Sequence, residues 1–209
     1  MLTSIRILLI SFALTCCCKL NYAQNQFFKG GLNIGLTTSQ IDGDNNAGFN
    51  KAGINAGAFV YAEIKANQFV QLEMNVVQKG SRKKPQKFDP STWARRLNYI
   101  ELPLLYKYKF KKLYYQGGIS YAQLINQKFI DNGIAYQPRE ELLFKRNELG
   151  YLVGISYDMN EKLAFETKYS RSLAPIRAQA YFVSWLGFFG GSYNSVLSFT
   201  LKYKFNAND

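Results

Sequence analysis

The sequence predicts an all-β fold, an eight-stranded antiparallel up-and-down transmembrane β-barrel. Three observations favour this fold: eight stretches in which apolar and polar residues alternate, a regular succession of short and long connections, and an N-terminal segment typical of exported proteins. A lipid bilayer offers no water to unpaired backbone groups, so strands cross it only in a closed sheet that has no edge.

Alternation with a period of two defines the strands, because successive side chains of a strand point to opposite faces. Between residues 98 and 110, for example, Ile100, Leu102 and Leu104 alternate with the charged residues Glu101 and Lys107. The expected strands lie near residues 27–38, 54–63, 70–76, 98–110, 113–125, 148–158, 163–171 and 195–205.

Connection lengths distinguish a barrel from a soluble β-sandwich, whose strands also alternate. The connections at 65–68, 111–112 and 160–162 are short, whereas those at 39–50, 80–96, 127–146 and 172–193 are long. A barrel with short periplasmic turns and long extracellular loops produces this succession, and a sandwich has no reason to show it.

Aromatic residues gather beside the short turns, which is typical of a girdle at the level of the lipid headgroups. The alternative is that aromatic residues are simply good strand formers. The expected girdle consists of Phe28, Tyr61, Phe69, Phe110, Tyr114, Tyr157, Phe165, Tyr203 and Phe205.

The first 23 residues have the pattern of a cleavable secretory signal: Arg6, then an apolar run at 7–14, then a polar exit to Ala23. The run is about half of the ~20 apolar residues that a membrane-spanning helix needs. A lipoprotein signal is the alternative, although none of the cysteines at 16–18 follows the usual small residue. We therefore expect a signal peptide at 1–23 and one barrel domain at 24–209.

Composition excludes several kinds of chemistry. The chain has no histidine, and its three cysteines all lie within the expected signal, which argues against disulfides, thiolate metal sites and most acid–base catalysis. The fragment at 42–46 resembles the opening of a calcium loop, but Ala47 and Gly53 stand where glycine and glutamate are needed. We expect no enzyme activity, no metal and no cofactor.

The charge suggests a partner. A net charge of +12 favours anionic surfaces, which for an exported barrel are membrane lipids and not nucleic acid.

One segment of the chain is distinctive: Asn98-Tyr99-Ile100-Glu101-Leu102-Pro103-Leu104-Leu105-Tyr106-Lys107-Tyr108. It resembles the PorT-like outer-membrane β-barrel family of Bacteroidota-type Gram-negative bacteria. Tyr22-Ala23-Gln24, Gly30–Gly35, Gly117-Gly118 and the last aromatic strand also fit that family. The resemblance implies an eight-stranded barrel in the outer membrane. The namesake of the family is associated with protein secretion across that membrane and with gliding.

Charged residues on the inward rows form the first candidate site. An eight-stranded barrel is filled by side chains, and buried charges are costly unless they are paired, so we expect ion pairs across the lumen. Structural plugging is the first interpretation, and a proton or ion path is the alternative. The residues are Glu73, Glu101, Lys107, Glu166, Lys168 and Lys202.

A basic segment between residues 79 and 96 forms the second candidate site. On the external side it would meet lipopolysaccharide phosphates, with which guanidinium groups form charge-assisted bonds. The alternative is a solvated loop, since exposed ion pairs are weak. The cations are Lys79, Arg82, Lys83, Lys84, Lys87, Arg95 and Arg96.

An apolar stretch in the last long loop forms the third candidate site. Such a segment must fold over the barrel mouth, enter the interface or contact a partner. Its residues are Tyr181, Phe182, Trp185, Phe188 and Phe189.

Two functions agree with these features. The first is a structural or binding barrel of the outer membrane that contacts lipid and lipopolysaccharide, with an accessory role in a protein-secretion or envelope complex as one form of it. The second is a narrow channel or transporter for small solutes.

Overall fold

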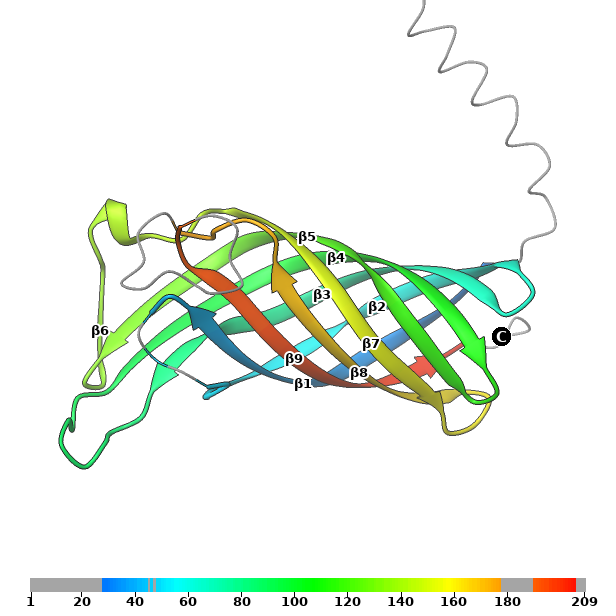
Figure 1. Cartoon of the computed structure of the whole chain (residues 1–209), viewed down its shortest axis with the longest axis horizontal. Helices are drawn as coiled ribbons and strands as arrows, with labels where there is room; N and C mark the ends of the chain where they lie inside the picture. The colour runs from blue at the N-terminus through cyan, green and yellow to red at the C-terminus, as the bar shows by residue number, and fades with distance from the viewer. Residues whose placement is uncertain (1–27, 45, 47, 178–189, 206–209) are drawn as a thin grey trace, which may run out of the picture.

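The computed structural model describes residues 28–44, 46, 48–177 and 190–205. The expected signal peptide at 1–23 lies outside this range. Within it the chain forms a closed antiparallel barrel (Figure 1). No helix among the described residues is long and apolar enough to cross a membrane.

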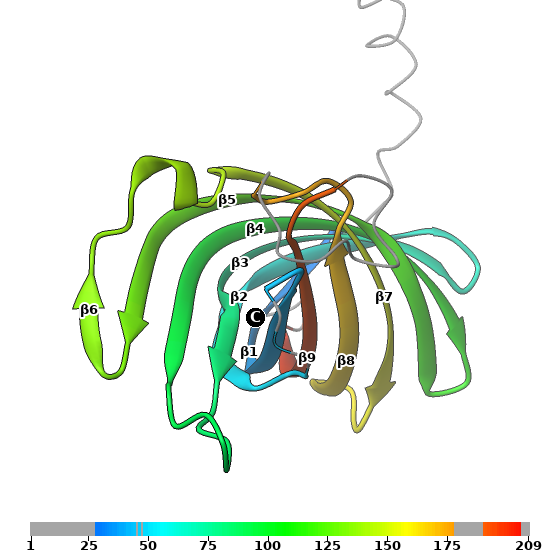
Figure 2. The same cartoon turned by 60° about the vertical axis from the view of Figure 1, so that its left-hand side comes forward.

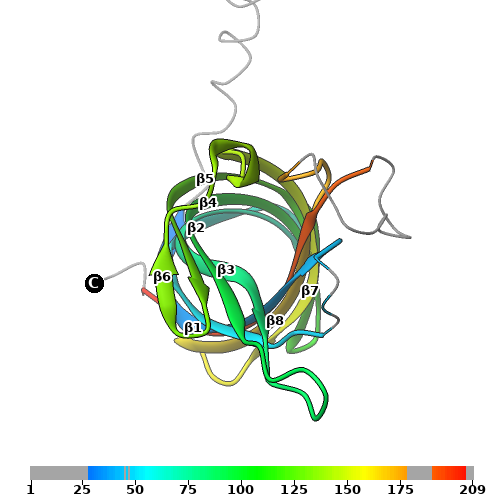
Figure 3. The same ribbon diagram turned by 90° about the vertical axis from the view of Figure 1, so that its left-hand side faces the viewer.

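Eight strands make up the wall of the barrel. Each pairs with the next along the chain, and β1 pairs with β9 to close the cylinder, as the view along its axis shows (Figure 3). The predicted eight-stranded up-and-down barrel is thus confirmed. The strands are β1 (Lys29–Asp42), β2 (Lys51–Lys65), β3 (Gln68–Lys83), β4 (Trp93–Phe110), β5 (Leu113–Asp131), β7 (Asn147–Asp158), β8 (Leu163–Ser172) and β9 (Tyr193–Lys204).

The two ends of the barrel differ. We call the end with the connections at 66–67, 111–112 and 159–162 the turn end, and the opposite one the loop end. Strands β3, β4 and β5 extend further toward the loop end than predicted, so the second loop covers 84–92 where 80–96 was expected. Beyond β5 the chain forms a ninth, short strand, β6 (Ile134–Tyr136), and a 3-10 turn, η2 (Glu140–Leu142) (Figure 2).

Sequence chemistry explains the turn end. Two residues join β2 to β3 and β4 to β5, and Asn67 and Lys111 adopt positive φ angles of 64° and 56° there. Asparagine adopts such angles more readily than most residues, and a positive φ at the first residue of a two-residue link, as at Lys111, matches the right-handed twist of the paired strands. At the closing seam, a Cβ on Gly35 would lie 2.1 Å from the carbonyl oxygen of Phe199, so β1 can approach β9 only with glycine at this position.

The outer face is an apolar belt. Ile100, Leu102 and Leu104 are 40–47% exposed on β4, while Glu101 and Lys107, at alternate positions of the same strand, are buried. The same division holds on the other strands, where the exposed apolar residues include Leu32, Ile34, Leu36, Ile54, Val60, Leu72, Met74, Val76, Ile119, Leu149, Val153, Ile155, Phe199 and Leu201.

The predicted aromatic girdle requires a correction. Six of its members are exposed at the turn end: Phe28, Phe110, Tyr157, Phe165, Tyr203 and Phe205. The other three, Tyr61, Phe69 and Tyr114, lie inside the barrel, where the Phe69 ring contacts both tyrosine rings at centroid distances of 5.7 and 6.3 Å. Their positions fall on the inward rows of their strands, and proximity to a turn does not indicate which face a side chain occupies.

Replacing Leu102 by arginine should destabilise the barrel in lipid by about 2–4 kcal/mol, because the charge would face acyl chains near mid-strand. Unfolding in lipid vesicles, followed by heat-modifiable gel mobility, measures this effect. Ile134→Arg is the matched control, since Ile134 is 73% exposed on β6, which lies beyond the eight strands of the wall. An equal loss for both variants would contradict the assignment of the belt.

Candidate functional site: a filled lumen and an outer basic groove

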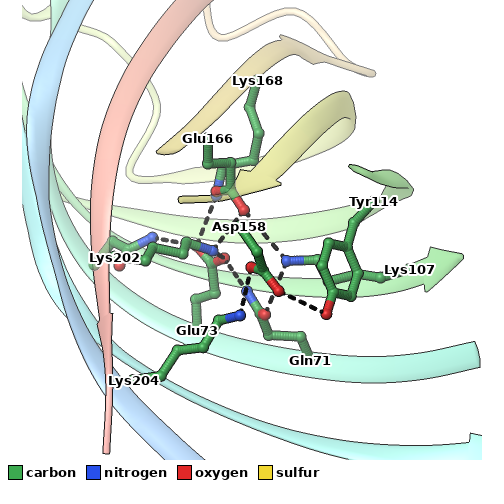
Figure 4. A network of polar contacts seen from close by, with 10 residues as sticks. Gln71, Glu73, Lys107, Tyr114, Asp158, Glu166, Lys168, Lys202 and Lys204 are labelled. Atoms are coloured by element: carbon green, nitrogen blue, oxygen red, sulfur yellow. Dashed lines mark hydrogen bonds and ion pairs between the residues drawn. The ribbon is translucent and has the colours of Figure 1, made fainter. Parts of the chain in front are cut away.

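Five charged side chains meet in the middle of the lumen (Figure 4). Lys202 contacts Glu73 at 2.6 Å and Glu166 at 2.7 Å, and Lys168 contacts the same two carboxylates at 2.7 and 2.9 Å. Lys107 lies 3.4 Å from Glu166. The two glutamates are at most 1% exposed, so they persist as charges only because the lysines surround them. We call these five residues the central cluster.

Amides extend the central cluster. Gln71 and Asn75, two residues on either side of Glu73 along β3, donate hydrogen bonds of 2.5 and 2.8 Å to its two oxygens. Asn33 on β1 donates in turn to Asn75 at 2.9 Å. The alternation of β3 thus places three polar side chains on one inward row, where they hydrogen-bond to one another.

The sixth predicted lumen residue, Glu101, belongs to a separate group nearer the loop end. Lys79 contacts Glu101 at 3.2 Å and Glu148 at 3.0 Å, and Ser120 donates to Glu101 at 2.8 Å. Asn194 donates to Glu148 at 2.6 Å. Lys79 was expected in the external basic loop, and this expectation is wrong: β3 continues to Lys83, and Lys79 is 1% exposed inside the barrel.

Charges in the described lumen balance. The two groups together contain four lysines, at 79, 107, 168 and 202, and four glutamates, at 73, 101, 148 and 166. A balanced set of buried ion pairs avoids the penalty that an uncompensated charge would carry.

At the turn end of the lumen, a third and smaller group of polar side chains centres on Asp158. Lys204 on β9 contacts Asp158 at 2.5 Å, and the Tyr114 hydroxyl donates to the same carboxylate at 3.0 Å. Between this contact and the central cluster lies a cavity of about 20 Å³, lined in part by Phe59, Phe69 and Lys107. That volume holds about one water molecule.

An apolar cluster fills the loop end of the lumen. Phe129 and Phe144 stack there with ring centroids 5.8 Å apart, and Tyr99 is fully buried. The cluster consists of Ile41, Leu97, Tyr99, Ala122, Leu124, Phe129, Phe144 and Ile176. Polar and apolar side chains therefore occupy the lumen from one end to the other.

Above the apolar cluster is a mouth cavity of about 410 Å³. Arg95 lines it, bonded to Asp131 at 2.6 Å and stacked 5.0 Å from the Trp93 ring. Arg95 was expected to face lipopolysaccharide from the outside, but its inward position on β4 makes this expectation wrong. Asp44 also lines the cavity, and burial raises its pKa from 3.8 to about 6.

An open groove lies at the loop-end rim of the same strands, and three of its cations, Arg82, Arg96 and Lys128, are on outward rows. It has a volume of about 590 Å³ and runs across β2, β3, β4 and β5 at the loop end. Arg82, Lys83 and Arg96 of the predicted basic segment line it, and Lys51 and Lys128, which the sequence analysis did not select, join them. We call these five cations and the hollow between them the outer basic groove.

The remaining predicted site residues lie elsewhere. Lys84 and Lys87 are exposed in the loop at 84–92 and do not line the groove. In that loop Asp89 accepts hydrogen bonds from Lys83 and Ser91, which lower its pKa to about 2. The apolar residues Tyr181, Phe182, Trp185, Phe188 and Phe189 lie outside the described part of the chain.

A closed barrel with an apolar belt and a lumen filled by ion pairs defines a small integral outer-membrane protein. The chain belongs to the outer membrane protein beta-barrel domain family, whose profile matches residues 22–177. A comparison with curated proteins found no match.

Solved structures of similar fold come from several bacteria. They include the attachment invasion locus protein Ail of Yersinia pestis, in complex with the heparin analogue sucrose octasulfate, at 12% identity and a TM-score of 0.48 over 85% of this chain and 99% of that one. Neisserial surface protein A shows 12% identity and a TM-score of 0.47 over 85% and 97%. The outer membrane protein OprG from Pseudomonas aeruginosa shows 14% identity and a TM-score of 0.36, over 86% of this chain and 95% of that one. These likenesses concern the fold alone.

Removing one carboxylate of the central cluster should destabilise the barrel. Glu73→Gln leaves three lysines facing one glutamate, and we expect a loss of about 3–5 kcal/mol in the free energy of unfolding, measured by urea titration in lipid vesicles. The double variant Glu73→Gln/Lys202→Met returns the cluster to its original net charge and should recover part of the loss. A double variant less stable than the single one would contradict the pairing.

The raised pKa of Asp44 predicts a dependence on pH. The folded-state pKa of about 6 lies above the ordinary value of 3.8, so the protonated form favours folding, and this stabilisation is lost as the pH rises through about 6. Asp44→Asn removes the ionisation and should raise the thermal midpoint at pH 8 more than at pH 5. An equal effect at both pH values, measured in the same detergent, would show that ionisation of Asp44 is not responsible.

Proposed function

We propose that this chain is a non-conducting barrel of the outer membrane, with a structural and binding role carried out at its loop end. The observation that supports this most directly is the occupied lumen. The central cluster, the Lys79 group and the apolar cluster follow one another along the axis, and the cavity beside the central cluster holds about one water molecule.

A channel would require these groups to move apart. Opening the central cluster would separate Glu73 and Glu166 from lysines that lie 2.6–2.9 Å away and would leave buried charges uncompensated. A structural plug therefore fits the ion-pair geometry better than the alternative, a narrow channel or transporter for small solutes.

The loop end supports a role in binding. It carries the outer basic groove and the mouth cavity, whereas the turn end has short connections of two to four residues. In our proposal the loop end faces the cell exterior and contacts outer-membrane lipid and lipopolysaccharide, and residues 1–23 direct export before they are removed. No catalytic role is assigned to any residue.

A place in the PorT-like branch of the family is part of the proposal, together with an accessory role in a protein-secretion or envelope complex. Support comes from the segment at 98–108, whose Tyr99 and Glu101 point into the lumen. Asn194 donates to the Tyr99 hydroxyl at 3.3 Å, and Lys79 contacts Glu101 at 3.2 Å. The segment that carries the resemblance therefore contributes to the filling of the barrel.

Conductance in planar bilayers tests the proposed plug. The purified protein should insert without discrete current steps, because the ion pairs and the apolar cluster occupy the lumen. An open porin in the same bilayers serves as the positive control, and heat-modifiable gel mobility verifies that the inserted protein is folded. Stable steps of uniform size would overturn the plug in favour of the channel.

A further inference from the structure

The outer basic groove has the composition of an anion site. Five of the described residues that line it are cations, Lys51, Arg82, Lys83, Arg96 and Lys128, and none is a carboxylate. Four amides, Asn50, Gln78, Asn98 and Asn126, add further polar groups. We propose that this groove binds the phosphate groups of a lipopolysaccharide molecule in the outer leaflet. The inference rests on the proposed function, because it requires the loop end to face outward.

The groove cations differ in their partners from the cations inside the barrel. Among the described residues, the lysines of the lumen all contact glutamates, and Arg95 and Lys204 contact aspartates. In the groove, Lys83 pairs with Asp89, whereas Lys51, Arg82, Arg96 and Lys128 form no ion pair with any described residue. Four like charges around one hollow repel one another, and an anion between them would relieve that repulsion.

Strand register brings these cations together. Arg96 on β4 stands directly opposite Lys128 on β5, and Gly80 of β3 is opposite Arg96 on its other side. Gly80 has a φ of 134°, and a Cβ there would lie 1.9 Å from the carbonyl oxygen of Arg95. Glycine is therefore required at this position, and the row that contains Arg96 and Lys128 has no side chain on β3.

Lys51 forms the side of the groove on β2. It is 7% exposed, and its ammonium donates to the carbonyl oxygen of Ala52 at 2.6 Å. An ammonium has three donors and no acceptor, so the groups left after this bond suit an oxyanion.

The depth of the groove identifies a lipid as the source of the phosphate. One outward row nearer the turn end than Gln78 and Asn98, Val76 and Ile100 are paired, with exposed fractions of 54% and 40%, and both belong to the apolar belt. The groove thus begins where the belt ends, at the level where acyl chains give way to headgroups. A lipid whose acyl chains lie along Val76 and Ile100 would place a phosphorylated sugar against Arg96 and Lys128.

Lipid retention by the full chain tests the proposal. The protein is folded in phosphatidylcholine vesicles that contain either lipid A with its phosphates or the same lipid after phosphate removal, then extracted in mild detergent, and the bound lipid is measured by native mass spectrometry. The unmodified protein should retain phosphorylated lipid A and lose the dephosphorylated form. Arg96→Gln/Lys128→Gln should reduce retention about tenfold, since each lost contact is a charge-assisted bond.

Two control variants distinguish binding in the groove from the effect of total positive charge. Lys111→Gln/Lys112→Gln removes the same charge from an exposed turn at the opposite end, and its retention should stay unchanged. Arg96→Lys/Lys128→Arg keeps the charge and should preserve most of the retention. An equal loss in the groove and turn variants would overturn the proposal, as would equal retention of the two forms of lipid A.

A free anion is the remaining competitor for the groove. Inorganic phosphate that displaces lipid A at equal concentration would assign the groove to a soluble ion and overturn the lipid. Conductance of Arg96→Gln/Lys128→Gln is recorded in parallel and should show no current steps. The groove and the plug can therefore fail independently, because lipid retention reports the first and conductance the second.

Discussion

The pairing of Glu73 and Glu166 with Lys168 and Lys202 is the interaction on which the rest of the barrel depends. An eight-stranded cylinder has an interior that side chains must fill, and here the filling is ionic in the middle and apolar at the loop end. Burying two carboxylates is unfavourable by itself, and the lysines offset that penalty only in the closed cylinder, where β3, β8 and β9 face one another. Closure of the sheet and neutrality of the lumen are thus two aspects of one constraint.

Much of this arrangement could be predicted from alternation alone. The period of two assigned Glu101 and Lys107 to the lumen and Ile100, Leu102 and Leu104 to the membrane, and the structure places them on those faces. The partners of each charge could not be predicted, because they depend on which strands face each other across the lumen. Glu101 and Glu166 both lie on inward rows of their strands, yet they belong to different ion-pair groups.

The misplaced residues show where the sequence analysis used the wrong signal. Lys79 follows Glu73, Asn75 and Val77 on the same inward row, and continuing the alternation would have placed it in the lumen. The density of positive charge around it predicts a loop instead, and this prediction is wrong because β3 continues to Lys83. Arg95 was misplaced for the same reason. Lys51 and Lys128 were not predicted as site residues, because they are distant from Arg96 in the sequence and approach it only in the folded sheet.

The contacts of Glu73 also constrain the order of assembly. Its bond from Lys168 joins residues 95 positions apart in the chain, and its bond from Lys202 joins residues 129 apart. If the strands assemble in chain order, β3 pairs with its neighbours before either lysine arrives, and the carboxylate stays hydrated until the last hairpin docks. Contacts between such distant segments form late and slow the overall reaction. Water therefore has to leave the interior in the final step, when the seam between β1 and β9 closes.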